Sequence, residues 1–185
     1  MANLDNAFGA KPIRREGGGN IHVNRYYCNV ADALYIGDIV ALEGTADTEG
    51  VPSVIACTAS LIPVGVVVGM EVSKDRLDSQ LYKKSGDAVY LLVADSPSLS
   101  FEMQVNGTLA ATDFGLNADL GFTEGSTVTG RSKMELLLST KATTGALHMH
   151  MRRLAKQPDN EIGADAIVEC SWSQHAYADG ESAGV

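Results

Sequence analysis

Apolar and polar residues alternate over short segments along most of the chain. The clearest case is 101–105, where Phe101, Met103 and Val105 share one face of an extended segment and polar residues occupy the other. Runs of this kind, rich in β-branched residues and bounded by Gly, Pro and Asp, predict β-strands. Further strands are predicted at 21–23, 25–30, 33–42, 54–57, 64–72, 88–94, 134–138, 146–154 and 166–172.

Two long segments interrupt the strand pattern. Residues 73–87 are mostly polar, which predicts a loop or one short helix between two β regions. Residues 113–133 are rich in Gly, Ser and Thr, which predicts a long loop with room for one helical turn. Loops of that length inside a compact domain are usually functional or mobile. Gly65 and Gly69, inside a Val-rich run, indicate bulges or a close approach of two backbones.

Residues 1–20 predict an extended N-terminal arm. Pro12 excludes a continuous helix, and the triglycine at 17–19 is a flexible break. Phe8 and Ile13 are large apolar residues in a segment that is otherwise mostly small or polar. An arm with so little apolar surface does not fold alone, so we expect it to become ordered only by docking on another surface.

These patterns predict a mainly β protein with a small β-barrel or sandwich body over 21–185, the N-terminal arm and the long Gly/Ser/Thr-rich loop. The body admits a subdivision into a small barrel over 21–75 and a second β region over 85–185. A chain of 185 residues that is 45% hydrophobic is long and apolar enough to bury a core. No apolar run approaches the ~20 residues that span a bilayer, and no secretory signal is predicted. No internal repeat of fixed period is visible.

The net charge of −9 is distributed unevenly along the chain. Residues 1–30 carry +2, residues 31–84 carry −4 and residues 85–185 carry −7. An acidic body disfavours nucleic-acid binding, because affinity for phosphates comes mainly from Lys and Arg. A slightly basic arm on an acidic body suits an acidic protein surface, although the same charges also serve solubility alone.

No motif in the sequence assembles a catalytic, nucleotide or metal site. The triglycine at 17–19 lacks the spacing of a phosphate-binding loop, and no nucleophile elbow is present. His148 and His150 share one strand face, but a third metal ligand is not visible nearby, so two solvated imidazoles are the simpler interpretation. Cys28, Cys57 and Cys170 are odd in number and widely spaced, which predicts buried reduced thiols in a protein made in a cytoplasm. We therefore expect no enzyme activity and no cofactor.

An interaction protein is the remaining class, and aromatic residues and arginines are enriched at protein interfaces. Tyr26 and Tyr27 are adjacent on one strand, so one of them must face away from the local core. Trp172 is instead expected in the core. The candidate partner-binding residues are Phe8, Pro12, Ile13, Arg14, Arg15, Tyr26 and Tyr27.

Several blocks of the sequence, in order, resemble tailed-bacteriophage capsid cement proteins, also called decoration or head-stabilising proteins. The segment AFGAKPIR at 7–14 is similar to the Phe-Gly-Leu-Arg-Pro-Val-Arg opening of that family, and RLAKQPDNEIGA at 153–164 is the block most similar to it. The triglycine and the His148/His150 pair depart from the family pattern. The other resembling blocks are 24–27, 35–40, 65–69, 90–95, 101–104, 117–120, 127–132 and 141–144.

This resemblance implies a mainly β virion structural protein that binds the outer surface of the major capsid protein shell and stabilises it. It also implies a homotrimer with extended arms, made in the host cytoplasm and located on the capsid exterior. From the charge and the short apolar runs, no nucleic-acid or membrane partner is expected. Two alternatives stay open: a tail or neck structural protein built from a similar barrel, and a small-ligand-binding β-barrel.

Overall fold

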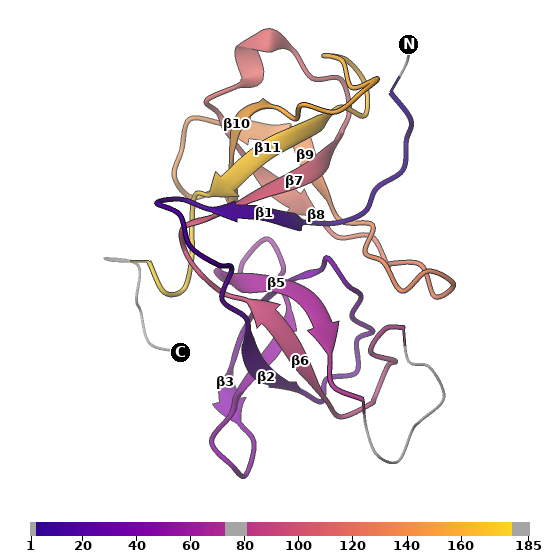
Figure 1. Ribbon diagram of the computed structural model, residues 1–185, viewed down its shortest axis with the longest axis vertical. Helices are drawn as coiled ribbons and strands as arrows, with labels where there is room; N and C mark the ends of the chain where they lie inside the picture. The colour runs from indigo at the N-terminus through magenta and orange to yellow at the C-terminus, as the bar shows by residue number, and fades with distance from the viewer. Residues whose placement is uncertain (1–2, 73–80, 179–185) are drawn as a thin grey trace.

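The computed structural model describes residues 3–72 and 81–178, and it consists of two closed rings of β-strands stacked along the long axis (Figure 1). The predicted mainly β class, with a small barrel, is confirmed. The one helical element among the described residues is the 3₁₀ turn η1 (Ala111–Asp113). No helix in that part of the chain is long and apolar enough to cross a membrane.

The first ring is a closed five-stranded barrel with strand order β2-β4-β3-β5-β6. β2 and β4 pair in parallel, and every other neighbouring pair is antiparallel. Its interior is filled by Tyr26, Leu34, Leu91 and valines from several strands, all buried. The strands are β2 (Asn24–Cys28), β3 (Ile39–Ala46), β4 (Pro52–Ala56), β5 (Pro63–Met70) and β6 (Val89–Ala94).

The second ring contains the remaining strands in the order β7-β11-β10-β8-β9, and a parallel pairing of β9 with β7 closes it. β1 adds to the other half of β7 as an antiparallel edge strand. The expected inward face of 101–105 is confirmed, because Phe101, Met103 and Val105 are fully buried. The strands are β1 (Lys11–Arg15), β7 (Leu99–Asn106), β8 (Asn117–Gly121), β9 (Glu135–Ala142), β10 (Met149–Leu154) and β11 (Ile167–Trp172).

The two rings have the same topology, although the sequence shows no period. In each, the first strand in chain order pairs in parallel with the third and antiparallel with the fifth. In each, the second strand pairs antiparallel with the third, and the fourth strand lies between the second and the fifth. The chain therefore builds one five-stranded barrel twice, from 24–94 and from 99–172.

The boundary between the barrels differs from the predicted subdivision at 75–85. β6 belongs to the first barrel, where it pairs with both β2 and β5 and closes the ring. Gly65 permits this closure, since a Cβ there would lie 2.5 Å from the carbonyl oxygen of Ala94. The predicted connection at 73–87 lies partly outside the described residues, and its described end contributes a bridge from Lys83 to Leu34.

One apolar core joins the two barrels. β3 alternates across its own barrel wall: Val40 faces the interior, while Ile39 and Ala41 belong to the core of the second barrel. Val66 and Ala94 also join that core from the first barrel. Because buried side chains of both barrels share one cluster, the two barrels form a single packed body.

Candidate functional site

The N-terminal arm is extended, as predicted, and it docks on the body of its own chain. The side chain of Gln104 donates to the carbonyl of Leu4 at 2.7 Å and accepts from the N–H of Asn6 at 3.0 Å. Ala10, 2% exposed, donates its backbone N–H to the carbonyl of Gly37 in the first barrel at 2.9 Å. β1 then pairs with β7. The surface that orders the arm is therefore supplied within the chain.

Two of the three apolar candidates on the arm line a groove beside the first barrel. Phe8 and Pro12 line a groove of about 270 Å³ whose opposite wall includes Val67 and Val68 of β5. Phe8, Pro12 and Ile13 are all half-buried within the chain. Only part of their apolar surface is thus available to a partner.

The two arginine candidates already have partners. Arg14 pairs with Glu169 of β11 and lies 3.5 Å from Glu16, measured from its Nε to Glu16 Oε1. Arg15 donates from Nε to the hydroxyl of Ser98 at 3.3 Å. Their guanidinium groups therefore hold β1 to the second barrel, in addition to any contact they make with another protein.

The two contacts of Arg14 belong to a network in which three arginines, Arg14, Arg152 and Arg153, pair with two glutamates, Glu16 and Glu169. Arg152 lies 2.6 Å from Glu16, and Arg153 lies 2.8 Å from Glu169. Burial acts to raise the pKa of Glu169, but the hydrogen bond from Arg153 and the charges of Arg14 and Arg153 outweigh it and hold that pKa below its ordinary value. The network fixes the arm to β10 and β11 through charge-assisted bonds.

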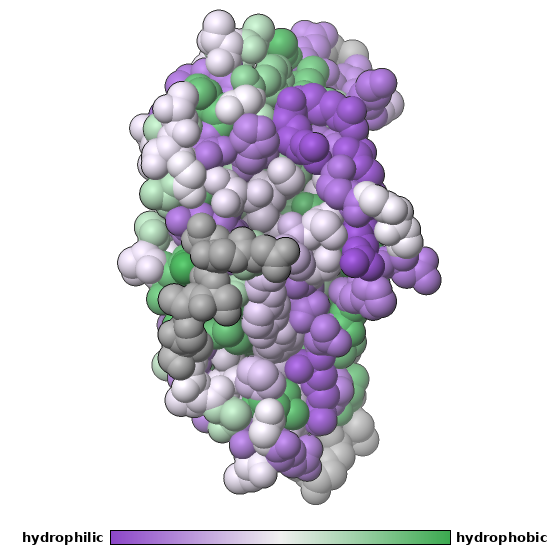
Figure 2. Space-filling model, turned by 90° about the vertical axis from the view of Figure 1, so that its left-hand side faces the viewer, coloured by the Kyte–Doolittle hydropathy of each residue, from purple (hydrophilic) through white to green (hydrophobic). Residues whose placement is uncertain are grey.

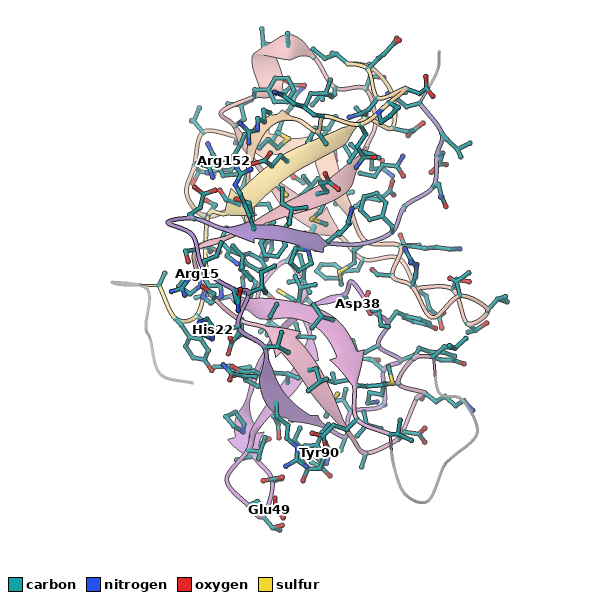
Figure 3. The ribbon with its side chains drawn as sticks, viewed as in Figure 1. Arg15, His22, Asp38, Glu49, Tyr90 and Arg152 are labelled. Atoms are coloured by element: carbon teal, nitrogen blue, oxygen red, sulfur yellow. The ribbon has the colours of Figure 1, made fainter. Side chains whose placement is uncertain are left out.

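The side of the molecule that carries Arg15, His22 and Arg152, seen at the left in Figure 3, faces the viewer in Figure 2. Figure 2 shows hydrophilic residues spread widely over this face, with hydrophobic residues in separate small groups. An interface on this face would combine polar contacts with scattered apolar ones.

The tyrosine pair divides between core and surface. Tyr26 was a candidate contact residue, but it is 4% exposed inside the first barrel and donates its hydroxyl to Asp95 at 2.6 Å. Burial and this bond raise the pKa of Tyr26. Tyr27 points outward and is half-buried, with its ring centroid 5.4 Å from that of Tyr90. The alternation expected for adjacent strand residues thus leaves Tyr27 as the accessible member.

His148 and His150 are not the solvated pair that the sequence indicated. His148 is 1% exposed, with Nδ1 2.7 Å from Asp119 Oδ1 and Nε2 3.1 Å from the carbonyl oxygen of Leu61 in the first barrel. His150 is half-buried and bonds to Asn117 at 2.7 Å. His148, just before β10, meets the first barrel at Leu61, while Arg152 on the same face is exposed, so alternation alone does not imply exposure. Among the described residues, no three His, Cys, Asp or Glu side chains gather into a metal site.

The cysteines are buried, unpaired thiols, as predicted. Burial raises the pKa of Cys57 to about 12 and also raises that of Cys28 and Cys170. Because the thiolate is the reactive form, none of the three is arranged as a nucleophile.

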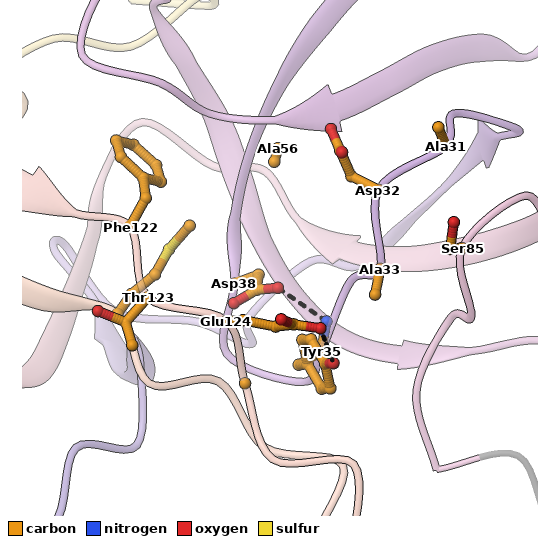
Figure 4. Close-up of a pocket in the computed structure, with 12 residues that line it drawn as sticks. Ala31, Asp32, Ala33, Tyr35, Asp38, Ala56, Ser85, Phe122, Thr123 and Glu124 are labelled. Carbon is orange, nitrogen blue, oxygen red and sulfur yellow. Dashed lines mark hydrogen bonds between the residues drawn. The ribbon is translucent and has the colours of Figure 1, made fainter.

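A pocket of about 450 Å³ opens where the two barrels meet (Figure 4). Asp38, 5% exposed, accepts a hydrogen bond from the backbone N–H of Tyr35 at 2.8 Å, and the Tyr35 hydroxyl lies 3.3 Å from Glu124 Oε1. Burial raises the pKa of Asp38 to about 6. The pocket is lined by Ala31, Asp32, Ala33, Tyr35, Asp38, Ala56, Ser85, Phe122, Thr123, Glu124, Gly125 and Met134.

Neighbouring contacts fix the wall of this pocket. Lys83 is fully buried, and its ammonium donates to the carbonyls of Val30 at 2.6 Å and Asp32 at 2.8 Å. Burial lowers the pKa of Lys83, and the carbonyl oxygens compensate the buried ammonium with hydrogen bonds. The rings of Tyr35 and Tyr82 stack with centroids 4.8 Å apart. The pocket is therefore preformed.

The sequence did not identify this pocket. Its walls come from 31–38 and 122–134, two segments that meet only through the packing of one barrel on the other. The sequence feature at Asp38 that could have indicated a site is the pair Gly37-Asp38 before a strand. Such pairs occur at many turns that have no function.

In comparisons with known proteins, no family model, no curated protein and no solved structure matches this chain. Its function is therefore inferred from its residues and its architecture.

Proposed function

We propose that this protein is a non-enzymatic structural protein of a tailed-phage virion, a cement protein that binds the outer surface of the major capsid protein shell. The proposed assembly is a homotrimer on the capsid exterior. The observation that carries the proposal is the ordered series of sequence blocks that resemble this family. These blocks fall on the arm, on both barrels and on the turn between β10 and β11, so the resemblance extends over the whole architecture.

The rigidity of the body supports a stapling role. The two barrels share one core, and the arm is fastened by β1 and by the arginine–glutamate network. A preformed body loses little conformational freedom on binding, so more of each contact contributes to attachment. In an oligomer, several modest contacts then act together through high effective concentration.

Of the two alternatives, the ligand-binding barrel is less well supported. Among the described residues, the interior of the first barrel is packed with its own buried side chains, whereas ligand-binding barrels enclose a central cavity. A tail or neck protein fits the same architecture, and copy number separates it from a cement protein.

The test is the amount of this polypeptide in purified virions of the phage that encodes it. A cement protein is expected at a copy number comparable with that of the major capsid protein, and it should leave the particle when the capsid surface is stripped. A few copies per particle, retained with isolated tails or necks, would instead identify a tail or neck component. Absence from virions would overturn the proposal.

A further inference from the structure

An equivalent aspartate closes a tight turn in each barrel, between the first and second strands. In the first barrel, Asp38 N–H donates to the Tyr35 carbonyl at 3.1 Å, and Tyr35 N–H donates to Asp38 Oδ2 at 2.8 Å. In the second barrel, Asp113 N–H donates to the Ala110 carbonyl at 3.0 Å, and Ala110 N–H donates to Asp113 Oδ2 at 2.9 Å. Both side chains are buried. The two carboxylates therefore occupy corresponding places in the repeated topology.

The two aspartates differ in what neutralises them. Asp113 holds the ammonium of Lys141, from near the end of β9, at 2.7 Å. The corresponding strand of the first barrel, β4, ends at Ala56, which lines the inter-barrel pocket. Within residues 3–72 and 81–178, no lysine or arginine forms an ion pair with Asp38. Asp38 instead accepts a hydrogen bond from the neutral hydroxyl of Ser132. The second barrel thus supplies a cation to its aspartate, and the first supplies only a hydroxyl beside an open pocket.

The pocket combines the two surfaces that a lysine side chain needs. Ala33, Ala56 and Phe122 offer apolar walls to an alkyl stem. Asp38 and Glu124 offer carboxylate oxygens to an ammonium group, and Figure 4 shows both near the centre of the lining residues. A buried carboxylate without a cation favours a positively charged ligand, because charge-assisted hydrogen bonds are the strong ones.

We propose that the inter-barrel pocket binds the ammonium group of a lysine side chain supplied by another polypeptide, in the role that Lys141 has in the second barrel. The binding site itself rests on contacts within this chain. Only the identity of the donor rests on the proposed function, which makes the donor a surface lysine of the major capsid protein.

The first test is a nuclear magnetic resonance titration of the isolated protein with Nα-acetyl-lysine amide. The control ligand is Nα-acetyl-norleucine amide, which has the same alkyl stem and no ammonium. The lysine probe is expected to shift the amide signals of Ala33, Phe122 and Gly125 saturably, with at least about tenfold higher affinity than the norleucine probe. Equal affinities, or no shifts at the pocket, would overturn the site.

The second test uses Asp38→Asn, which keeps the shape of the side chain and an acceptor for the Tyr35 N–H. This variant should bind the lysine probe about tenfold more weakly, while Glu43→Gln, an exposed carboxylate elsewhere on the first barrel, should bind it as the parent protein does. Wild-type affinity should also fall between pH 7 and pH 5, since Asp38 takes up a proton there; the other titratable groups facing it are Asp32, Glu124 and Tyr35. Unchanged affinity in Asp38→Asn would assign binding to another group and refute the site.

The third test addresses the donor. Undecorated capsids are mixed with wild-type protein, Asp38→Asn or Glu43→Gln and then sedimented. Weaker co-sedimentation of Asp38→Asn alone supports a capsid lysine as the donor, and equal co-sedimentation of all three refutes it. If wild-type protein itself does not co-sediment, the proposed function fails, and the probe titration still decides whether the pocket binds lysine.

Discussion

The Nε2 atom of His148, in the second barrel, lies 3.1 Å from the carbonyl oxygen of Leu61, in the first. The other ring nitrogen is 2.7 Å from Asp119, so the imidazole bonds on both sides while it is 1% exposed. The surrounding contacts between the barrels are mainly apolar. Apolar contacts have no preferred direction, so they set the relative orientation of the two barrels only weakly. The hydrogen bonds of His148 are directional and therefore help to fix that orientation.

Replacement of His148 by alanine should destabilise the protein. The change removes both hydrogen bonds and leaves a cavity next to two partly buried acceptors, so the free energy of unfolding should fall by about 3 kcal/mol. Urea denaturation measures this. His150→Ala, at a half-buried position two residues further along the chain, should cost less than about 1 kcal/mol. Equal losses in the two variants would show that the link between the barrels contributes nothing.

Asp38→Asn should stabilise the protein at neutral pH. The folded-state pKa of Asp38 is about 6 against an ordinary value of 3.8, so the folded protein carries an unfavourable charge above pH 6. As pH falls through 6 toward 3.8, the folded state takes up the proton first and wild-type stability rises. The variant should therefore gain up to about 3 kcal/mol at pH 7 and lose this advantage near pH 4. Thermal unfolding at several pH values checks both statements.

The matched control is Asp113→Asn, whose effect should have the opposite sign. The hydrogen bond from Lys141 lowers the pKa of Asp113, so its contribution is present above the ordinary value of 3.8 and is lost as pH falls below it. With Lys141 partly exposed, the loss at pH 7 should be about 1 kcal/mol. Changes of the same sign in the two variants would contradict the assignment of different environments to these equivalent residues.

Deletion of residues 1–16 should lower the thermal transition of the free protein. The sequence alone predicts an arm that becomes ordered only by docking on another surface, and the structure supplies that surface within the chain: β1 lies on β7 and Ala10 is buried. Removing the arm exposes a sheet edge and apolar surface, so a loss above about 2 kcal/mol is expected. Phe8→Ala, at a half-buried position, should lose about 1 kcal/mol. An unchanged transition in the deletion would mean that the arm is not part of the folded unit.

Gly125→Ala should destabilise the loop that lines the pocket. A Cβ at this position would lie 2.4 Å from Cγ of Tyr35 and 2.6 Å from the carbonyl oxygen of Arg131. Relief requires a shift of backbone or of a buried ring, at about 1–3 kcal/mol. Gly145→Ala is the control, because a Cβ there meets no atom within 4 Å. Chemical denaturation of both proteins should separate them clearly.

The isolated protein should form a homotrimer. The expectation comes from the family resemblance and from half-buried aromatic and apolar groups, such as Tyr27 and Phe8, that remain partly accessible. Light scattering on a size-exclusion column at micromolar concentration gives the molar mass directly. A monomer under those conditions would count against this assembly.

The strands were largely predictable because alternation is a local property. The segments 54–57, 88–94 and 166–172 coincide closely with β4, β6 and β11. Ile21-His22-Val23 was predicted as a strand and is not one, since two β-branched residues without a pairing partner do not form a ladder. β8 lies inside the predicted long loop at 113–133; its register with β9 and β10, a tertiary property, makes it a strand.

Long-range relationships were not predictable in the same way. Nothing local indicates that His148 faces another barrel rather than solvent, because both environments follow the same two-residue alternation. The repeat of the barrel topology is also hidden, since the pairing order is conserved while loop lengths and side chains differ. The Asp38 pocket was not predictable for both reasons: its walls meet only when the barrels pack, and its likeness to the Asp113 turn depends on the hidden repeat.

The attachment of β1 to β7 has a consequence for the order of assembly during synthesis. All five strands of the first barrel precede residue 95, so this barrel can close while the rest of the chain is still being made. β1 is made before any of them, yet its partner strand begins at Leu99, and Arg14 finds Glu169 only near the end. This segment is thus made before its partners and reaches its place late. Until then a nascent chain carries β1 unpaired, with Lys11 and Arg14 not yet joined to Glu102 and Glu169.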